Sequence, residues 1–260
     1  MKNLFIKGFL LNCLFMHATG NAKLVESNIE YKEGKSTLEG YLVYDDAIQN
    51  RAPGILVTHN WMGISDTTKY EAQELAKKGY VAFAADIYGK DIRPKNQQEA
   101  GALAGLYKKD RKLFRERMKA GLKALLKQKN VDSKKIAAIG FCFGGTGVIE
   151  LARSGAKINA AVSFHGGLDS PKAEDGKNIK AKILALHGAI DPYVSTDELT
   201  AFEDEMKKYN VDFQIIKYGG AVHSFTDKSA GNDIKKGAAY NESADRRSHL
   251  AMDQLFKEIF

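Results

Sequence analysis

Six short apolar runs recur along the chain, and most of them contain no alternating polar residue. They lie at Gly54 to Val57, Tyr80 to Ala85, Ile136 to Ile139, Ala160 to Phe164, Ile183 to Leu186 and Phe213 to Tyr218. Runs of this kind are typical of strands that are buried on both faces of a parallel sheet. Segments with helical spacing separate them, at Phe114 to Leu125, at Leu199 to Tyr209 and from Met252 to Ile259. Strands that alternate with helices predict a doubly wound, mostly parallel α/β fold with helices on both faces.

The first part of the predicted sheet differs from the rest. Two polar-alternating stretches within Ser27 to Val43 flank Glu33-Gly34, which predicts an antiparallel hairpin at the sheet edge. No internal repeat or linker follows, and 260 residues with 44% apolar content can bury a full core. We therefore predict a single domain over residues 23–260.

Residues 1–22 have the composition of a secretory signal peptide. Lys2 and Lys7 are followed by an apolar stretch from Gly8 to Met16, and small residues come next. The apolar stretch is too short for a stable membrane anchor. We expect cleavage near residue 20 or 22 and a periplasmic or secreted protein. The mature chain would then lose Cys13 and keep Cys142 as its only thiol, so it could form no internal disulfide.

Composition argues against several other classes of protein. The formal net charge is +7, but the basic residues are scattered among 32 acidic ones, which favours a solvated surface over a nucleic-acid site. The six histidines lack metal-ligand spacing, and no glycine-rich nucleotide loop is present. We expect no metal, no cofactor and no nucleic-acid partner, and we expect a monomer.

The segment Gly140-Phe141-Cys142-Phe143-Gly144-Gly145 directly follows the apolar run that ends at Ile139. The pattern Gly-x-nucleophile-x-Gly between a strand and a helix predicts a nucleophile elbow. It would place the thiol at a helix N-terminus, where free N–H groups and the helix dipole favour a thiolate. An isolated cysteine can also be a small buried hydrophobe. The paired glycines and the strand–helix context favour the nucleophile.

A thiol nucleophile needs a base, and the base needs a group that orients it. Asp191 follows the run that ends at Leu186, and His223 follows the run that ends at Tyr218. The order nucleophile, acid, histidine is the order used in α/β-hydrolases. Each of the two could instead be an ordinary turn residue. Four other histidines are interpreted as structural or pocket-lining residues: His59, His165, His187 and His249.

The loop after Val57 reads Thr58-His59-Asn60-Trp61-Met62. A backbone N–H from this loop, together with the N–H of Phe143, would form an oxyanion hole with two donors. We choose Trp61 as the loop donor, although its indole could equally be a packed aromatic group.

Four motifs resemble those of the dienelactone hydrolase family, which has the α/β-hydrolase fold. They are the elbow at Cys142, Ala85-Asp86-Ile87-Tyr88-Gly89, His187-Gly188-Ala189-Ile190-Asp191-Pro192 and Ala221-Val222-His223-Ser224-Phe225. The resemblance implies that Cys142 is the nucleophile, His223 the base and Asp191 the acid that orients it. It also implies that Trp61 and Phe143 supply the oxyanion donors.

The chain departs from the best known members of that family at three positions. Asn60 stands where they have a glutamate, and Lys90 and Asp227 stand where they have two arginines that hold a substrate carboxylate. An aspartate would repel a carboxylate. The resemblance therefore supports the reaction chemistry better than it supports the identity of the substrate. Five residues are candidates to line the pocket: Asn60, Tyr88, Lys90, Arg93 and Phe225.

The motifs favour a secreted cysteine hydrolase that acts on a small-molecule ester, lactone or thioester. Asn60 and Asp227 leave open a binding protein that keeps the hydrolase fold without turnover. A third alternative is a thiol redox role for Cys142, in which the mature chain would lack a resolving cysteine.

Overall fold

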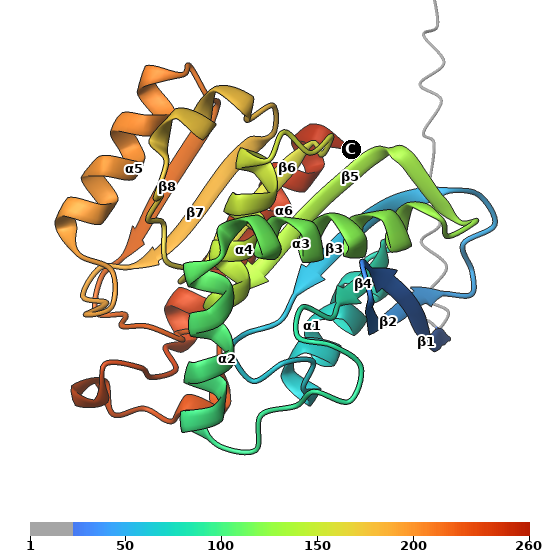
Figure 1. The fold of residues 1–260 in the computed structure, drawn as a ribbon, viewed down its shortest axis with the longest axis horizontal. Helices are drawn as coiled ribbons and strands as arrows, with labels where there is room; N and C mark the ends of the chain where they lie inside the picture. The colour runs from blue at the N-terminus through green and yellow to red at the C-terminus, as the bar shows by residue number, and fades with distance from the viewer. Residues whose placement is uncertain (1–22) are drawn as a thin grey trace, which may run out of the picture.

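The computed structural model describes residues 23–260, so the signal peptide expected over 1–22 lies outside the described residues. Eight strands form one sheet in the order β1-β2-β4-β3-β5-β6-β7-β8 (Figure 1). The strands are β1 Leu24–Glu33, β2 Ser36–Asp45, β3 Ala52–Thr58, β4 Val81–Ala85, β5 Val131–Phe141, β6 Ala160–Phe164, β7 Lys182–Gly188 and β8 Phe213–Tyr218. The six strands from β3 to β8 are parallel, whereas β1 and β2 pair antiparallel and β2 joins β4 antiparallel.

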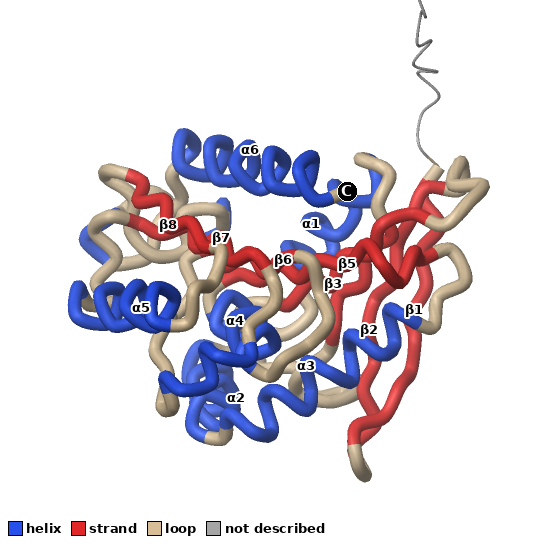
Figure 2. The backbone as a smooth tube through the Cα atoms, turned by 90° about the horizontal axis from the view of Figure 1, so that it is seen from above, coloured by secondary structure: helices blue, strands red, loops and turns tan. Residues whose placement is uncertain are grey.

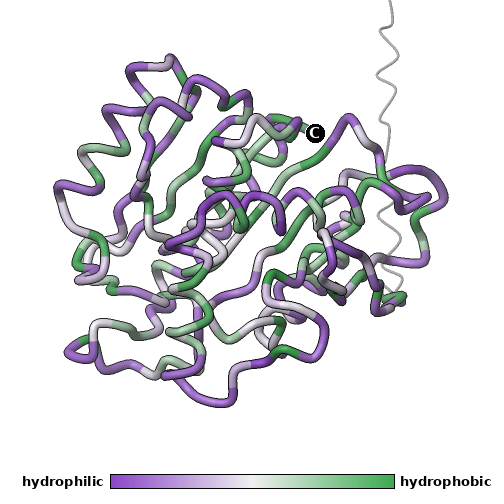
Figure 3. Tube along the Cα trace, viewed as in Figure 1, coloured by the Kyte–Doolittle hydropathy of each residue, from purple (hydrophilic) through white to green (hydrophobic). Residues whose placement is uncertain are grey.

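The parallel strands coincide with the six apolar runs, and all of them except the edge strand β8 are largely buried on both faces. Every residue of β4 and of β6 is buried, and Ile55, Leu56 and Val57 of β3 are fully inaccessible. The strands in the middle of the molecule are accordingly its most hydrophobic segments (Figure 3). The doubly wound, mostly parallel sheet predicted from the sequence is confirmed.

Helices cover both faces of the sheet, as the alternating pattern predicts. Figure 2 shows α1 and α6 on one side and the other four helices on the opposite side. The helices are α1 Asp66–Lys77, α2 Gln97–Lys109, α3 Arg111–Leu126, α4 Phe143–Arg153, α5 Thr196–Lys208 and α6 Glu242–Ile259. Each face has its own apolar cluster, one around Phe114 and Phe202, the other around Leu75 and Phe256.

The N-terminal hairpin forms where the polar alternation predicts it. Residues from Leu24 to Glu33 pair with residues from Ser36 to Asp45, and the turn between them contains Gly34 at φ 53°. This conformation is easy for glycine and unfavourable for residues with a side chain. Within the described residues no helix is long and apolar enough to cross a membrane.

Helix α2 was not anticipated from the sequence. Gly101 and Gly105 lie inside it, and glycine weakens a helix by about 1 kcal/mol relative to alanine. Its start nevertheless carries a recognisable signal. Asn96 accepts a hydrogen bond from the N–H of Glu99, and Glu99 accepts one from the N–H of Lys95. This arrangement is close to a capping box, with the return bond made to the residue before the N-cap.

Candidate active site

Cys142 occupies a sharp bend between β5 and α4. Its backbone has φ 54° and ψ −115°, which is rare for a residue with a side chain. The neighbouring glycines are required by space. A Cβ atom on Gly140 would lie 2.1 Å from the carbonyl oxygen of Gly144, and one on Gly144 would lie 2.3 Å from that of Thr58. The segment therefore forms the strand–turn–helix bend that its spacing predicts.

Side chains from the ends of three strands meet at this bend. His223 Nε2 lies 3.0 Å from Cys142 Sγ, and His223 Nδ1 lies 2.8 Å from Asp191 Oδ2. The Asp191 carboxylate is fully buried, the imidazole is 12% exposed and Cys142 is half-buried. A carboxylate, an imidazole and a thiol in contact in this order can transfer a proton from sulfur to the ring.

The charges on sulfur and imidazole stabilise each other. Burial raises the pKa of the Cys142 thiol, but the charge and the hydrogen bond of His223 outweigh it and bring the pKa below its ordinary value. Burial lowers the pKa of His223, whereas the sulfur charge and the hydrogen bond to Asp191 raise that pKa to about 10. Both directions favour a thiolate–imidazolium pair at neutral pH.

A tight turn after β7 holds Asp191. Its second carboxylate oxygen accepts the N–H of Tyr193 at 2.8 Å. A Cβ atom on Gly188 would lie 2.6 Å from the carbonyl oxygen of Val222, so the loops after β7 and β8 are in direct contact. The ring of Tyr193 lies edge-on to that of His223, with 5.2 Å between centroids. The acid and the base are thereby fixed relative to each other.

One backbone N–H contacts the sulfur, and a second backbone segment lies beside the elbow. The N–H of Phe143, the first residue of α4, hydrogen-bonds to the Cys142 sulfur and helps to lower the thiol pKa. Gly144 packs directly on the carbonyl groups at the end of β3, which brings the following loop with Trp61 beside the elbow. Tyr88 Oη donates to the carbonyl oxygen of Trp61 at 2.8 Å and fixes that loop. Backbone N–H groups so placed can stabilise an oxyanion.

The sequence model of the dienelactone hydrolase family matches residues 38–260. This chain belongs to the dienelactone hydrolase family. It is 37% identical to a solved structure named m3DLH, with a TM-score of 0.88 over 91% of this chain and 99% of that one. A dienelactone hydrolase-like promiscuous phosphotriesterase from metagenomic libraries is 39% identical, with a TM-score of 0.87 over the same shares of the two chains.

A further relative comes from Bradyrhizobium sp. and is named as a probable 2-oxo-3-(5-oxofuran-2-ylidene)propanoate lactonase. It is 28% identical over 208 residues, which are 75% of this chain and 83% of the relative. The α/β-hydrolase fold implied by the sequence motifs is thereby confirmed. The chain is a dienelactone hydrolase-like enzyme of the ester and lactone hydrolase class.

In this hydrolase, three of the five candidate pocket residues support the loops and the packing around the nucleophile. Asn60 Oδ1 accepts the N–H of Met62 at 2.9 Å and closes a turn in the loop that contains Trp61. Tyr88 is buried between aromatic rings and touches that same loop through its hydroxyl group. Phe225 is fully buried against Tyr218 and the ring of His165, so the structure places it behind the base.

The two cationic candidates are engaged elsewhere. Lys90 pairs with Glu30 of the N-terminal hairpin, and its backbone N–H donates to Thr37. Arg93 donates to the carbonyl oxygens of Gly89 and Ile92. The structure brings neither of them to the sulfur. Their side chains turn toward partners that are distant in sequence or toward local backbone, which sequence spacing does not reveal.

Asp227, the third departure from the family pattern, caps a short 3₁₀ helix through the N–H of Ser229. It lines a cavity of about 670 Å³ between α1, α6 and the loop after His223. No group of side chains in residues 23–260 has the composition of a metal site.

Sequence reasoning did not single out Tyr193, whose ring packs against the base. It also did not predict that His165 contacts the base. Tyr193 directly follows the Asp-Pro turn, and this adjacency is a usable signal. His165 was interpreted only as a structural or pocket-lining residue. Its ring packs edge-on to His223 with 5.2 Å between centroids. Among the other histidines, burial lowers the pKa of His59 to about 4 and also lowers that of His187.

Proposed function

We propose that the chain is an exported cysteine hydrolase that cleaves an ester, lactone or thioester through an acyl-cysteine intermediate. The 3.0 Å contact between Cys142 Sγ and His223 Nε2 carries the proposal. Membership of the dienelactone hydrolase family and the buried Asp191 behind the imidazole support it. A thiolate at the start of a helix, beside a protonated base, is poised for acyl transfer.

In the first half of the proposed reaction, the Cys142 thiolate adds to the substrate carbonyl carbon. The oxygen becomes negative and accepts hydrogen bonds from the N–H groups of Trp61 and Phe143. When the carbonyl reforms, the bond to the leaving alcohol or thiol breaks, and His223 gives this group its proton. The products are an acyl-cysteine, a neutral imidazole and the free alcohol or thiol.

In the second half, the neutral His223 removes a proton from a water molecule, whose oxygen adds to the acyl carbon. Collapse of this intermediate breaks the carbon–sulfur bond, releases the carboxylic acid and restores the Cys142 thiolate and the imidazolium. Asp191 keeps the ring oriented and stabilises its positive charge in both halves.

We propose substrates without a carboxylate next to the reacting carbonyl. Lys90 and Arg93 are already paired with acidic or backbone partners, and Asp227 stands where the best known members have an arginine. The positions that hold a carboxylate in those members therefore offer it no free cation here. Esters or lactones whose acyl part is neutral fit these contacts better.

The direct test compares the purified protein with Cys142→Ala on 4-nitrophenyl esters and on neutral lactones of increasing ring size. Multiple turnover by the wild-type protein, abolished in the variant, is the expected result. An acyl adduct on the Cys142 peptide should appear by mass spectrometry when the reaction is quenched early. Equal rates for the two proteins would refute the proposal.

The alternative of a binding protein without turnover predicts a different result in that assay. Saturable ligand binding would persist, and no product would accumulate over hours. The complete chain of contacts from Asp191 to the sulfur favours turnover.

Neutral phosphotriesters are a second candidate substrate class. The observation that favours them is the 39% identity to the promiscuous phosphotriesterase. Attack of the Cys142 thiolate on phosphorus would expel the phenolate of an aryl dialkyl phosphate and leave a phosphoryl-cysteine. Absorbance of released 4-nitrophenol tests this class, and a trace equal to that of Cys142→Ala would exclude it.

We also propose export, supported by the composition of residues 1–22. Expression of the chain with and without this segment in a bacterial host, followed by separation of periplasm and cytoplasm, tests it. Recovery of the form that carries this segment from the cytoplasm, uncleaved, would contradict it.

A further inference from the structure

His165 lies beside both the nucleophile and the base. It follows β6, is 2% exposed and has φ 41°, a conformation that few side-chain-bearing residues adopt. Its N–H donates to the carbonyl oxygen of Leu186, which ties it to β7. Its ring packs edge-on against His223 and Phe225, with centroids 5.2 and 5.0 Å away. The ring therefore packs against both the base and Phe225.

Both ring nitrogens of His165 have a partner. Nδ1 accepts the backbone N–H of Cys142 at 3.2 Å, an N–H that it shares with the carbonyl oxygen of Phe164 at 3.0 Å. Nε2 lies 2.8 Å from Thr226 Oγ1. A backbone N–H can only donate, so Nδ1 must be free of a proton. A neutral ring then carries its proton on Nε2 and donates it to the Thr226 hydroxyl group.

The surroundings of His165 keep the ring neutral. Burial and the nearby positive charge of His223 hold its pKa well below the ordinary value, and His249 and His187 act in the same direction. A second positive charge beside the imidazolium of His223 would oppose the thiolate–imidazolium pair. A neutral His165 is therefore compatible with the proposed charge on His223.

We propose that His165, fixed by Thr226 as the neutral Nε2–H tautomer, is a positioning residue that holds the Cys142–His223 pair in reacting geometry. This role rests on the proposed function, because it concerns the same thiol. Neither residue touches the sulfur. His165 acts on the backbone of the nucleophile and on the ring face of the base, and Thr226 acts only through His165.

One consequence distinguishes this arrangement from ordinary packing. A valine at Thr226 has almost the same shape but offers no acceptor to Nε2–H. The buried Nε2–H would be left without an acceptor, so nothing would hold the ring in the orientation that receives the N–H of Cys142. The ring or the elbow is then free to shift. Replacement of the Thr226 hydroxyl group by a methyl group would thus disturb the thiol, although Thr226 acts on it only through His165.

Two matched pairs of variants in the full chain test the role. His165→Asn keeps an acceptor near the position of Nδ1, whereas His165→Leu has the same branched shape without one. Thr226→Ser keeps the hydroxyl group, whereas Thr226→Val removes it. The second pair leaves the unusual backbone of His165 untouched, so it separates tautomer control from backbone strain. Thermal unfolding first establishes that each variant is folded.

The primary readout is the rate at which iodoacetamide alkylates Cys142, followed on its own peptide by mass spectrometry. We expect His165→Leu and Thr226→Val to react roughly tenfold more slowly than their matched partners, in line with loss of one buried hydrogen bond. On an ester substrate, kcat should fall by a similar factor while KM changes little, because His165 and Thr226 are buried behind the site. Nitrogen NMR of the wild-type protein should assign the His165 proton to Nε2.

Equal alkylation rates within both pairs, or a proton on Nδ1, would overturn the positioning role. Alkylation needs only the thiol and not turnover. If wild-type protein fails to hydrolyse esters but the alkylation rates still separate within each pair, the proposed function fails and the positioning role stands.

Discussion

At the scale of single residues, buried histidines of this protein reach very different pKa values. Burial lowers the pKa of His59 to about 4. Burial also acts on His249, but hydrogen bonds to Asp245 and Glu71 raise its pKa to about 10. His223 reaches the same value through the sulfur and Asp191. A carboxylate or a thiolate in contact therefore decides which buried ring is charged.

The pH dependence of thiol reactivity follows from the His223 contact. The pKa of Cys142 is lowered, so the thiolate persists below the ordinary thiol pKa, and alkylation should level off at a lower pH than for an ordinary thiol. In His223→Gln the counter-charge is lost and burial remains. The pKa then exceeds the ordinary value of about 8.5, and the rate should level off only at a higher pH. Iodoacetamide labelling against pH measures both curves, and two curves of one shape would refute the ion pair.

Removal of the carboxylate charge should impair the base without unfolding the protein. In Asp191→Asn the amide can no longer stabilise the imidazolium, and its NH₂ group can force the wrong tautomer on His223. We expect kcat/KM for an ester to fall by about 10²- to 10⁴-fold. Asp204→Asn, an equal change on the exposed side of α5, is the control. Similar activity in the two variants would contradict the assigned role.

The order of motifs was sufficient to select residues that meet in space. Cys142, Asp191 and His223 each follow a buried parallel strand, and the carboxyl ends of such strands share one edge of the sheet. The directions in which the loop side chains point could not be predicted from the sequence. Lys90 lies 60 residues from its partner Glu30, and nothing in the local sequence records that pairing.

At the scale of elements, the close approach of α4 to β3 decides where the nucleophile stands. The first turn of α4 can lie against the carbonyl groups at the end of β3 only because Gly144 lacks a side chain. The same contact sets the loop of Trp61 next to the helix N-terminus. The absence of a side chain at Gly144 thus allows close packing of α4 and β3, which are more than 80 residues apart in the chain.

A methyl group added at this contact should be far more harmful than one added elsewhere. In Gly144→Ala the Cβ atom would lie 2.3 Å from a backbone oxygen, so we expect a loss of 1–3 kcal/mol or more in stability and loss of most activity. In Gly105→Ala, inside α2, the Cβ atom meets nothing within 4 Å, and the variant should gain about 0.5–1 kcal/mol. Urea unfolding of both variants measures the difference. Equal stabilities would contradict the packing argument.

Elements with buried side chains on both faces were predictable, whereas elements defined by short capping signals were not. The strand β6 was predicted to the residue because Ala160 to Phe164 are all buried. Helix α2 was missed because its apolar positions are interrupted by glycines and it packs on α3, α4 and loops rather than on the sheet.

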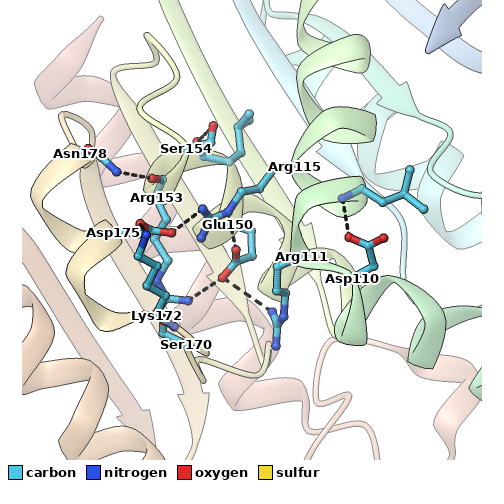
Figure 4. A network of polar contacts seen from close by, with 12 residues as sticks. Asp110, Arg111, Arg115, Glu150, Arg153, Ser154, Ser170, Lys172, Asp175 and Asn178 are labelled. Atoms are coloured by element: carbon cyan, nitrogen blue, oxygen red, sulfur yellow. Dashed lines mark hydrogen bonds and ion pairs between the residues drawn. The ribbon is translucent and has the colours of Figure 1, made fainter. Parts of the chain in front are cut away.

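At the scale of the whole molecule, a buried ion cluster joins helices on one face of the sheet. Glu150 of α4 receives Arg115 of α3 at 2.7 Å and Arg153 at 2.9 Å (Figure 4). Arg153 also binds Glu205 of α5 and the carbonyl oxygen of Leu168. Arg153 and Glu150 are fully buried. The scattered charged residues were predicted from the sequence to lie on a solvated surface. Some of them form this internal group instead. The sequence does not reveal the group because its members are distant in the chain.

Breaking this cluster should destabilise the fold. Arg153→Met leaves the carboxylates of Glu150 and Glu205 buried with fewer partners, and we expect a loss of about 3–5 kcal/mol. Lys207→Met breaks an exposed pair with Glu203 and should cost less than about 1 kcal/mol. Urea titrations of both variants compare the two losses. Midpoints within error of each other would show that the cluster does not stabilise the protein.

Helix α2 packs against the loops after β3 and β4 and against the start of α4 (Figure 1). Its Tyr107 packs on the rings of Tyr88 and Phe143, and its Gly101 faces Trp61. Burial raises the pKa of the Cys142 thiol, whereas the charges of His223 and of Lys108 in this helix lower it. Exchange of these 13 residues for another helix would therefore alter both the packing around Trp61 and the ionisation of the sulfur.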